Sequence, residues 1–113
     1  MRIEEYVIAY LDGALDVPVS GDVPSPLPAR FVTVELTGGY APEKIGRATL
    51  AVQSWDSSRA AAGALCETVI AAMDAMAGEP EISSVELDSA YNYTDTDRRK
   101  PRYQAVFDIV HYL

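Results

Sequence analysis

The chain has 113 residues, of which 49% are hydrophobic and 23% charged, and its 17 acidic against 9 basic side chains give a formal net charge of -8. This length predicts one domain with a single core, and the composition is typical of a folded protein rather than a disordered one. The acidic field disfavours binding to polyanions such as nucleic acid.

The first residues and the cysteine content bear on the cellular setting. Glu4 and Glu5 stand where a secretory signal needs a cationic region followed by an unbroken apolar one, so no signal peptide is expected. No other segment approaches the roughly 20 apolar residues that a membrane helix needs, so no membrane-spanning helix is expected. Cys66 is the single cysteine, which excludes an internal disulfide and a cysteine-based metal cluster within one chain. We expect a reducing, cytoplasmic setting and no membrane contact.

Apolar residues near the N-terminus follow the spacing of one helix face. The spacing i, i+3, i+4, i+7, i+8 predicts a helix over residues 2–13, which Gly13 would end. The residues of this face are Ile3, Tyr6, Val7, Tyr10 and Leu11.

The next segment, "LDVPVSGDVPSPLPAR", carries four prolines. Each proline fixes φ and removes a backbone donor, so at most residues 17–20 can form a short edge strand. The remainder is either a segment that reaches onto a partner or a rigid surface connector.

Two segments then alternate in hydrophobicity with the period of a half-buried strand. They are "RFVTVELTG" and "RATLAVQSW", which we expect to pair as neighbours. The stretch between them, "TGGYAPEKIG", has glycines and Lys44 but lacks the GxxxxGK[ST] spacing of a phosphate loop. We interpret it as a hairpin loop.

After residue 56 the period changes to that of a helix, predicted over residues 58–77. Ser57 or Ser58 can cap its start, and Gly78 followed by Pro80 ends it. Its expected core stripe is Leu65, Cys66, Val69, Met73 and Met76. The abundant alanine on the remaining surface indicates either packing against another subunit or strong helix propensity.

The last two strands are predicted in "ISSVELDSAYNYT" and "RYQAVFDIVHYL". Their expected core-facing residues are Val85, Leu87, Tyr91, Tyr93, Tyr103, Ala105, Phe107 and Ile109. The fold class is therefore α+β: a mostly antiparallel sheet of four to five strands with two helices packed on one face, in the order α-β-β-β-α-β-β. Val106, Val110 and Tyr112 lie on the other face, which suggests that something covers it.

No catalytic, cofactor or metal site is expected. His111, the sole histidine, lies in an apolar strand and is interpreted as structural. Asp95 and Asp97 resemble the start of a calcium loop, but the glycine and late glutamate are missing and cations follow directly. An enzyme with a carboxylate pair remains a weak alternative, because no spacing singles out one pair.

Four of the nine basic residues fall in one short segment: Arg98, Arg99, Lys100 and Arg102. They could hold a few phosphates, but single-strand recognition usually adds a wider positive groove. They could instead pair with Asp95 and Asp97 in the same loop, or with the acidic surface of a neighbouring copy. A plain solvated turn is the remaining alternative.

Several segments together resemble a known family. They are "IEEYVIAYL", "VPVSGDVP", "RFVTVELTGG", "ATLAVQSW", "SSVELDSAYNYTDTD" and "RYQAVFDIVHY", of which "YNYTDTD" and the last are the most specific. The chain resembles, over nearly its whole length, the small tail terminator proteins of siphophages and prophages, also described as tail-to-head joining or tail completion proteins.

The resemblance implies a virion assembly protein without enzymatic activity. It implies a homo-oligomer, a hexameric ring at the head-proximal end of the tail, that contacts the tail tube protein, ends tube polymerisation and offers a surface to the head connector protein. The ring would be assembled in the host cytoplasm, and an acidic lumen would let DNA pass without specific binding. Alternatives are a head-tail connector or stopper protein, or a small cytoplasmic oligomeric binding domain. Candidate residues for contacts with other subunits or the tube are Asp95, Asp97, Arg98, Arg99, Lys100, Arg102, Gln104, Val106, Asp108, Val110 and Tyr112.

Overall fold

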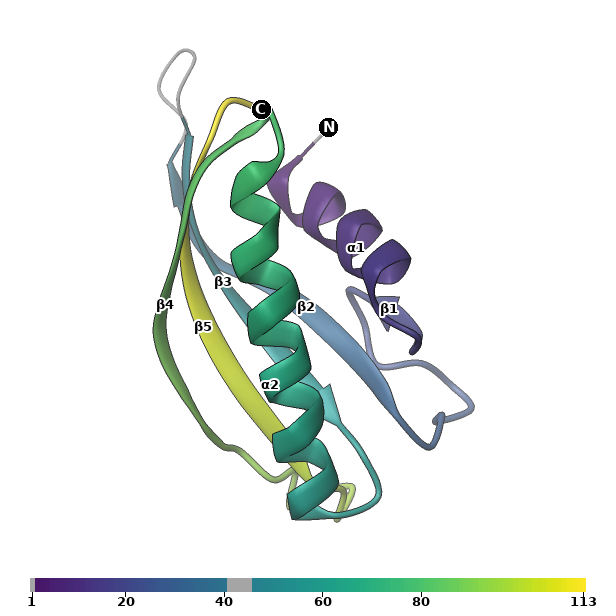
Figure 1. Ribbon diagram of the computed structural model, residues 1–113. Coiled ribbons are helices and arrows are strands. Elements are labelled where there is room, and N and C mark those ends of the chain that lie inside the picture. The colour runs from purple at the N-terminus through teal and green to yellow at the C-terminus, as the bar shows by residue number, and fades with distance from the viewer. Residues whose placement is uncertain (1, 41–45) are drawn as a thin grey trace.

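The computed structural model describes residues 2–40 and 46–113. Its elements follow the expected order (Figure 1). They are α1 (Ile3–Ala14), β1 (Val19–Ser20), β2 (Phe31–Tyr40), β3 (Gly46–Trp55), α2 (Arg59–Ala75) with the 3-10 turn η1 (Met76–Gly78), β4 (Ile82–Asn92) and β5 (Arg102–His111). The hairpin loop expected between the second and third strands falls largely on residues 41–45, outside the described residues, whereas Gly38 and Gly39 belong to β2.

The five strands form one sheet in the order β1-β2-β3-β5-β4. The three pairs β2–β3, β3–β5 and β4–β5 are antiparallel, and only the two-residue β1 runs parallel to its neighbour β2. The α+β class is confirmed, with a mixed rather than strictly antiparallel sheet. At one edge β4 has no strand beyond it, and at the other β1 pairs with only the first part of β2.

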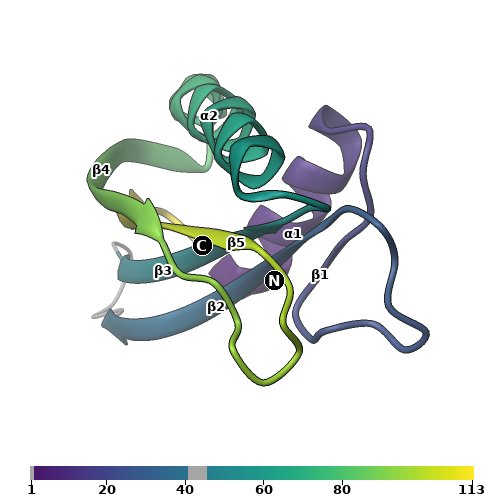
Figure 2. The same ribbon diagram turned by 90° about the horizontal axis from the view of Figure 1, so that it is seen from below.

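Both helices cover the same face of the sheet, as expected. Figure 2 shows α2 on one side of the sheet and the β4–β5 connection on the other. The core between helices and sheet is apolar, which stabilises the fold by removing this surface from water. Its fully or nearly fully buried members include Val7, Leu11, Val34, Leu50, Val52, Val69, Met73, Ala105, Phe107 and Ile109.

Local contacts fix the two helices in place. The Ser58 hydroxyl accepts a hydrogen bond from the Ala61 amide (3.0 Å), so Ser58 is the cap of α2. On α1, Tyr10 donates its hydroxyl proton to the Ala72 carbonyl of α2 (3.0 Å), and Tyr6 donates to Glu81 Oε1 (3.1 Å). Burial, together with this bond and the charge of Glu81, raises the pKa of Tyr6 to about 12.

One expectation about membranes needs correction. The segment Arg59–Gly78 is, by length and composition alone, long and apolar enough to cross a membrane. In the fold, however, Leu65, Val69 and Met73 on this helix are buried against the sheet. The core helix of a folded domain meets the same length and composition criteria, and in this fold one face of α2 packs in the core.

The facing of two tyrosines in β4 was predicted wrongly. Alternation placed Tyr91 and Tyr93 on the core face with Leu87, but the pairing with β5 shifts by one residue between Leu87 and Ser89. This β-bulge reverses the phase of the strand, because side chains alternate with a period of two. Tyr91 therefore lies opposite Gln104 on the face away from the helices, and both tyrosines are exposed, at 41% and 47%.

Candidate functional site

The candidate site is the sheet face opposite the helices, which we call the outer face. Strand register places its side chains, since paired residues point to the same side. From β2, β3, β5 and β4 they are Phe31, Thr33, Glu35, Thr49, Ala51, Gln53, Trp55, Arg102, Gln104, Val106, Asp108, Val110, Glu86, Ser89 and Tyr91. Segments from four strands thus meet on one surface.

A stack of aromatic rings and a guanidinium closes one end of the outer face. The rings of Phe31 and Trp55 are stacked, with centroids 5.1 Å apart, and both residues are fully buried. The Arg102 guanidinium carbon lies 4.7 Å from the Trp55 ring centre and 4.3 Å from that of Tyr93. Its Nε also donates to the Tyr93 carbonyl (2.6 Å). Arg102 is thus held between two rings by cation–π contacts and a hydrogen bond.

Asp95 organises the turn between β4 and β5. Its Oδ1 accepts from the backbone amides of Asp97 (2.9 Å) and Arg98 (3.0 Å), and its Oδ2 accepts from Arg98 Nη1 (2.7 Å). Two hydrogen bonds from Arg98 lower the pKa of Asp95 below its ordinary value: the bond from its backbone amide has the larger effect, and the bond from its guanidinium the next largest. The side chain of Asp95 is nearly buried, at 8% exposure, so this carboxylate is a structural part of the turn.

The pKa of Asp95 leads to a testable pH dependence. We expect Asp95→Asn to lower the free energy of unfolding at pH 7 by about 1–2 kcal/mol, because two amides and a guanidinium lose a charged acceptor. A carboxyl whose folded pKa is depressed stabilises the fold above its unfolded pKa and loses this contribution as the pH falls through the folded pKa. Urea unfolding of both proteins at pH 7 and at pH values below about 4 measures the difference. A gap that does not shrink in acid would contradict the assigned role.

We call the segment 21–30 the arm. Lys100 of the turn contacts this arm, and Arg30, the last residue of the arm, contacts Asp56 beside β3. Lys100 Nζ donates to the carbonyls of Ala29 (2.8 Å) and Asp56 (3.3 Å). Arg30 Nε lies 3.2 Å from Asp56 Oδ2, whose side chain is 10% exposed. The turn and the base of the arm are therefore fixed to the same corner of the sheet.

These contacts divide the basic cluster. Of the two ion-pair alternatives, pairing within the loop is confirmed for Arg98, which pairs with Asp95. Asp97 takes part in the loop through its backbone amide, which donates to Asp95. Lys100 and Arg102 are also committed to contacts within the chain. Arg99 differs: it is exposed, has a left-handed backbone (φ 52°), and makes no hydrogen bond or ion pair with the described residues. Of the four basic side chains, Arg99 is the one positioned to meet a partner.

A chain of side-chain hydrogen bonds crosses the sheet beside the aromatic stack. Trp55 Nε1 donates to Thr33 Oγ1 (3.0 Å), and Thr33 donates to Gln53 Oε1 (2.7 Å). Gln53 Nε2 donates to Gln104 Oε1 (2.7 Å), whose own amide donates to the Tyr91 hydroxyl (2.6 Å). Because each group is satisfied by its neighbour, the chain fixes the side-chain positions across four strands.

The remaining candidate residues lie further along β5. Val106 and Val110 are partly buried on the outer face, and Asp108 between them is exposed and accepts from Thr49 Oγ1 (2.8 Å). Tyr112 follows β5 and is 54% exposed. Gln104, Val106, Asp108 and Val110 thus form one stripe, and the turn containing Asp95 stands at its end.

Sequence reasoning missed Phe31 and Trp55 as members of this face. The signal was present: Trp55 is three residues from Val52, so alternation places the two on opposite faces. What the alternation could not indicate is the burial of these rings: Arg98 and Arg102 lie over the Trp55 ring, and the Phe31 ring stacks on Trp55.

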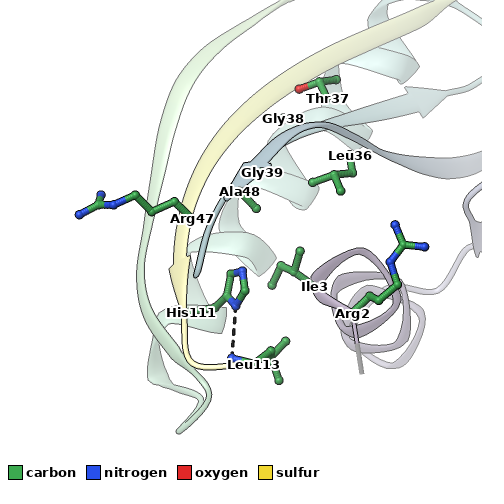
Figure 3. A pocket seen from close by; sticks show the side chains of 10 residues that line it. All are labelled: Arg2, Ile3, Leu36, Thr37, Gly38, Gly39, Arg47, Ala48, His111 and Leu113. Carbon is green, nitrogen blue, oxygen red and sulfur yellow. Dashed lines mark hydrogen bonds between the residues drawn. The ribbon is translucent and has the colours of Figure 1, made fainter. Parts of the chain in front are cut away.

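A cavity of about 530 Å³ lies elsewhere, at the first turn of α1 (Figure 3). Ile3, Leu36 and Leu113 line it together with His111, while the guanidinium of Arg47 points away from it. His111 is buried, its Nδ1 accepts from the Leu113 amide (3.2 Å), and burial lowers its pKa. The other polar residues lining the cavity are Arg2 and Thr37.

The chemistry of the described residues favours surface contact. Residues 2–40 and 46–113 contain no cluster of three or more histidine, cysteine, aspartate or glutamate side chains able to hold a metal ion. Cys66 is buried, which raises the pKa of its thiol and disfavours the nucleophilic thiolate. The outer face instead combines apolar, aromatic and charged groups on a rigid sheet, as interfaces between proteins do. A scan against protein-family models and a search of the curated proteins found no match to this chain.

Proposed function

We propose that the chain is a tail terminator of a siphophage or prophage, a non-enzymatic protein that caps the tail tube as a ring and presents a surface to the head connector. The proposal starts from the resemblance of several segments to that family. One structural observation carries it further: the segments that resemble the family most specifically supply the outer face.

The segment "RYQAVFDIVHY" is β5 together with Tyr112, the residue that follows it, and it contributes Gln104, Val106, Asp108 and Val110 to that face. "ATLAVQSW" contributes Gln53 and Trp55, and "YNYTDTD" contributes Tyr91 and the Asp95 turn. Along β5 and β4 this face is partly exposed and partly apolar and neither helix covers it, which suits contact with another protein. We assign this face, with Arg99 at its end, to the tube.

The experiment is reconstitution with the tail tube protein of the cognate phage. We expect the wild-type protein to bind tube ends and shorten the tube-length distribution seen by negative-stain microscopy. Val106→Asp combined with Val110→Asp should abolish capping, because two carboxylates would be buried without partners at the contact. Ala9→Asp, an exposed position on α1, is the matched control and should cap normally. Capping by the double variant would exclude the outer face as the tube contact.

Arg99 provides a second and gentler test. Arg99→Glu removes a side chain without contacts to the described residues, so stability should change by less than about 0.5 kcal/mol. If Arg99 meets the tube or another subunit, capping should weaken and the loss should be largest at low ionic strength, where surface charges are least screened. Capping that is independent of this substitution at every salt concentration would assign Arg99 to the solvated turn.

A further inference from the structure

An acid-rimmed apolar groove lies between α2 and β4, at one edge of the sheet. It has a volume of about 250 Å³, and Ile70, Ala71, Val85 and Leu87 line it. Leu87 is 46% exposed although it points to the helix side of the sheet, because α2 does not cover β4 completely. The carboxylates of Glu67 and Asp74 stand at its rim.

Strand addition at this edge is disfavoured. The edge strand β4 has two register shifts, between Ile82 and Ser84 and between Leu87 and Ser89, and it carries the exposed acids Glu86 and Asp88. Bulges and charges of this kind protect an edge against pairing with another strand. Two copies of β4 would also bring acids together. The occupant of the groove must therefore dock through side chains, and it cannot be strongly acidic.

The arm at the other edge of the sheet has the complementary properties. Its residues 23–29 are uncharged, and Leu27 among them is 44% exposed. Leu27 and Leu87 are the two exposed leucines among the described residues. At the base of the arm stand two cationic side chains, Arg30 and Lys100, which hold it against the domain. An arm held at its base loses little conformational freedom on binding.

We propose that Leu27 of one copy inserts into the groove between α2 and β4 of the next copy, beside its Leu87, so that copies associate head to tail. Figures 1 and 2 show the arm and β4 at opposite edges of the sheet. Two different patches on opposite sides make a heterologous contact, which generates a closed ring or an open filament rather than an isolated dimer. Arg30 is paired with Asp16 and Asp56 of its own chain, but Lys100 donates only to carbonyl oxygens, so its charge complements the acids Glu67 and Asp74 at the groove rim. The proposal names the self-contact of the ring, and in this respect it rests on the proposed function.

Cysteine cross-linking of the whole chain tests the contact. In a Cys66→Ala background, Leu27→Cys and Leu87→Cys in the same chain should give a ladder of covalent multimers under oxidising conditions. A mixture of the two single variants should give a covalent dimer and nothing larger, because each copy then carries one half of the contact. Cross-linking of either single variant alone, as efficient as that of the mixture, would indicate a symmetric contact and overturn the proposal. A chain that gives no cross-link at millimolar concentration would overturn it as well.

Sedimentation velocity supplies an independent measurement without cysteines. Leu27→Ser and Leu87→Ser should each weaken self-association at least about tenfold, since each removes a buried apolar side chain from the contact. Ala9→Ser changes an exposed side chain on α1, outside both the arm and the groove, and serves as the control. An equimolar mixture of the two serine variants should form heterodimers, because one intact arm meets one intact groove. Unchanged association of both variants would refute the contact.

The two proposals fail in different ways. Tube capping by a chain that shows no cross-link between positions 27 and 87 would refute the arm contact and leave the proposed function standing. Cross-linked multimers that do not alter tube length would refute the proposed function and leave the arm contact standing.

Discussion

Replacement of Trp55 by alanine is expected to lower the free energy of unfolding by about 3–5 kcal/mol, the range for removing a buried aromatic side chain. Trp55 is fully buried, stacks on Phe31, and carries the Arg102 guanidinium on its ring. Its Nε1 also begins the hydrogen-bond chain that reaches Tyr91. Urea unfolding followed by circular dichroism gives the stability, and amide hydrogen exchange of residues 93–101 reports whether the turn has been released.

The matched variant is Trp55→Phe, which retains an aromatic ring beneath Arg102 but loses the indole donor. We expect it to keep the turn protected from exchange and to cost less than half as much stability as the alanine variant, because stacking and most of the buried area remain. If Trp55→Ala leaves the exchange of residues 93–101 unchanged, the turn is held by Asp95 and Lys100 alone. The assignment of Trp55 as the base of the turn would then be wrong.

The elements that sequence periodicity predicted correctly are those whose burial is one-sided. Helix α1 presents an apolar stripe to one core, so the period of the stripe reports the geometry directly. The stripe of α2 was likewise predicted except for Ala62, with Met76 buried in η1 just beyond the helix, and Ser58 was one of two caps expected. When a helix is buried on one side only, the spacing of its apolar residues reflects that side. A short window of sequence is therefore enough to predict which residues are buried.

The facing of Tyr91 and Tyr93 could not be obtained from the same pattern. A bulge adds one residue to β4 near Asp88, and no glycine or proline marks it. The bulge is stabilised by the two tyrosines that it turns to the outer face, because Tyr91 contacts Gln104 and Tyr93 contacts Arg102 there. Those contacts join β4 to β5 across the turn, so alternation within β4 alone contains no trace of them.

The basic cluster illustrates a second limit of sequence reasoning. Four adjacent cations looked equivalent along the chain, yet their partners differ: Asp95 for Arg98, the Ala29 carbonyl for Lys100, and two aromatic rings for Arg102. Reversing the charge of the whole cluster would therefore break the fold of the turn together with any contact it makes. Arg99→Glu is the substitution that separates the two effects.

The last prediction concerns Gly46 and the sole histidine. A Cβ atom added to Gly46 would overlap the His111 ring, which lies directly across from it in the β3–β5 pair. We expect Gly46→Val to lower the free energy of unfolding by about 3 kcal/mol, the upper end of the cost of overpacking, because His111 is itself buried and has little room to move. Thermal unfolding by calorimetry measures the loss.

A second substitution tests whether the ring of His111 causes the loss of stability in the Gly46→Val variant. His111→Ala in the Gly46→Val background should recover a large part of the loss, since the space taken by the ring becomes free for the valine, and a double-mutant cycle gives the coupling energy. Gly13→Ala is the control: nothing lies within 4 Å of the added atom, and alanine in this exposed helical position should stabilise the protein by up to about 1 kcal/mol. Additive costs at positions 46 and 111 would show that the two do not share this space. Strong coupling would support the structural role expected for His111, because a ring that fills the space above Gly46 in the sheet is held there by packing.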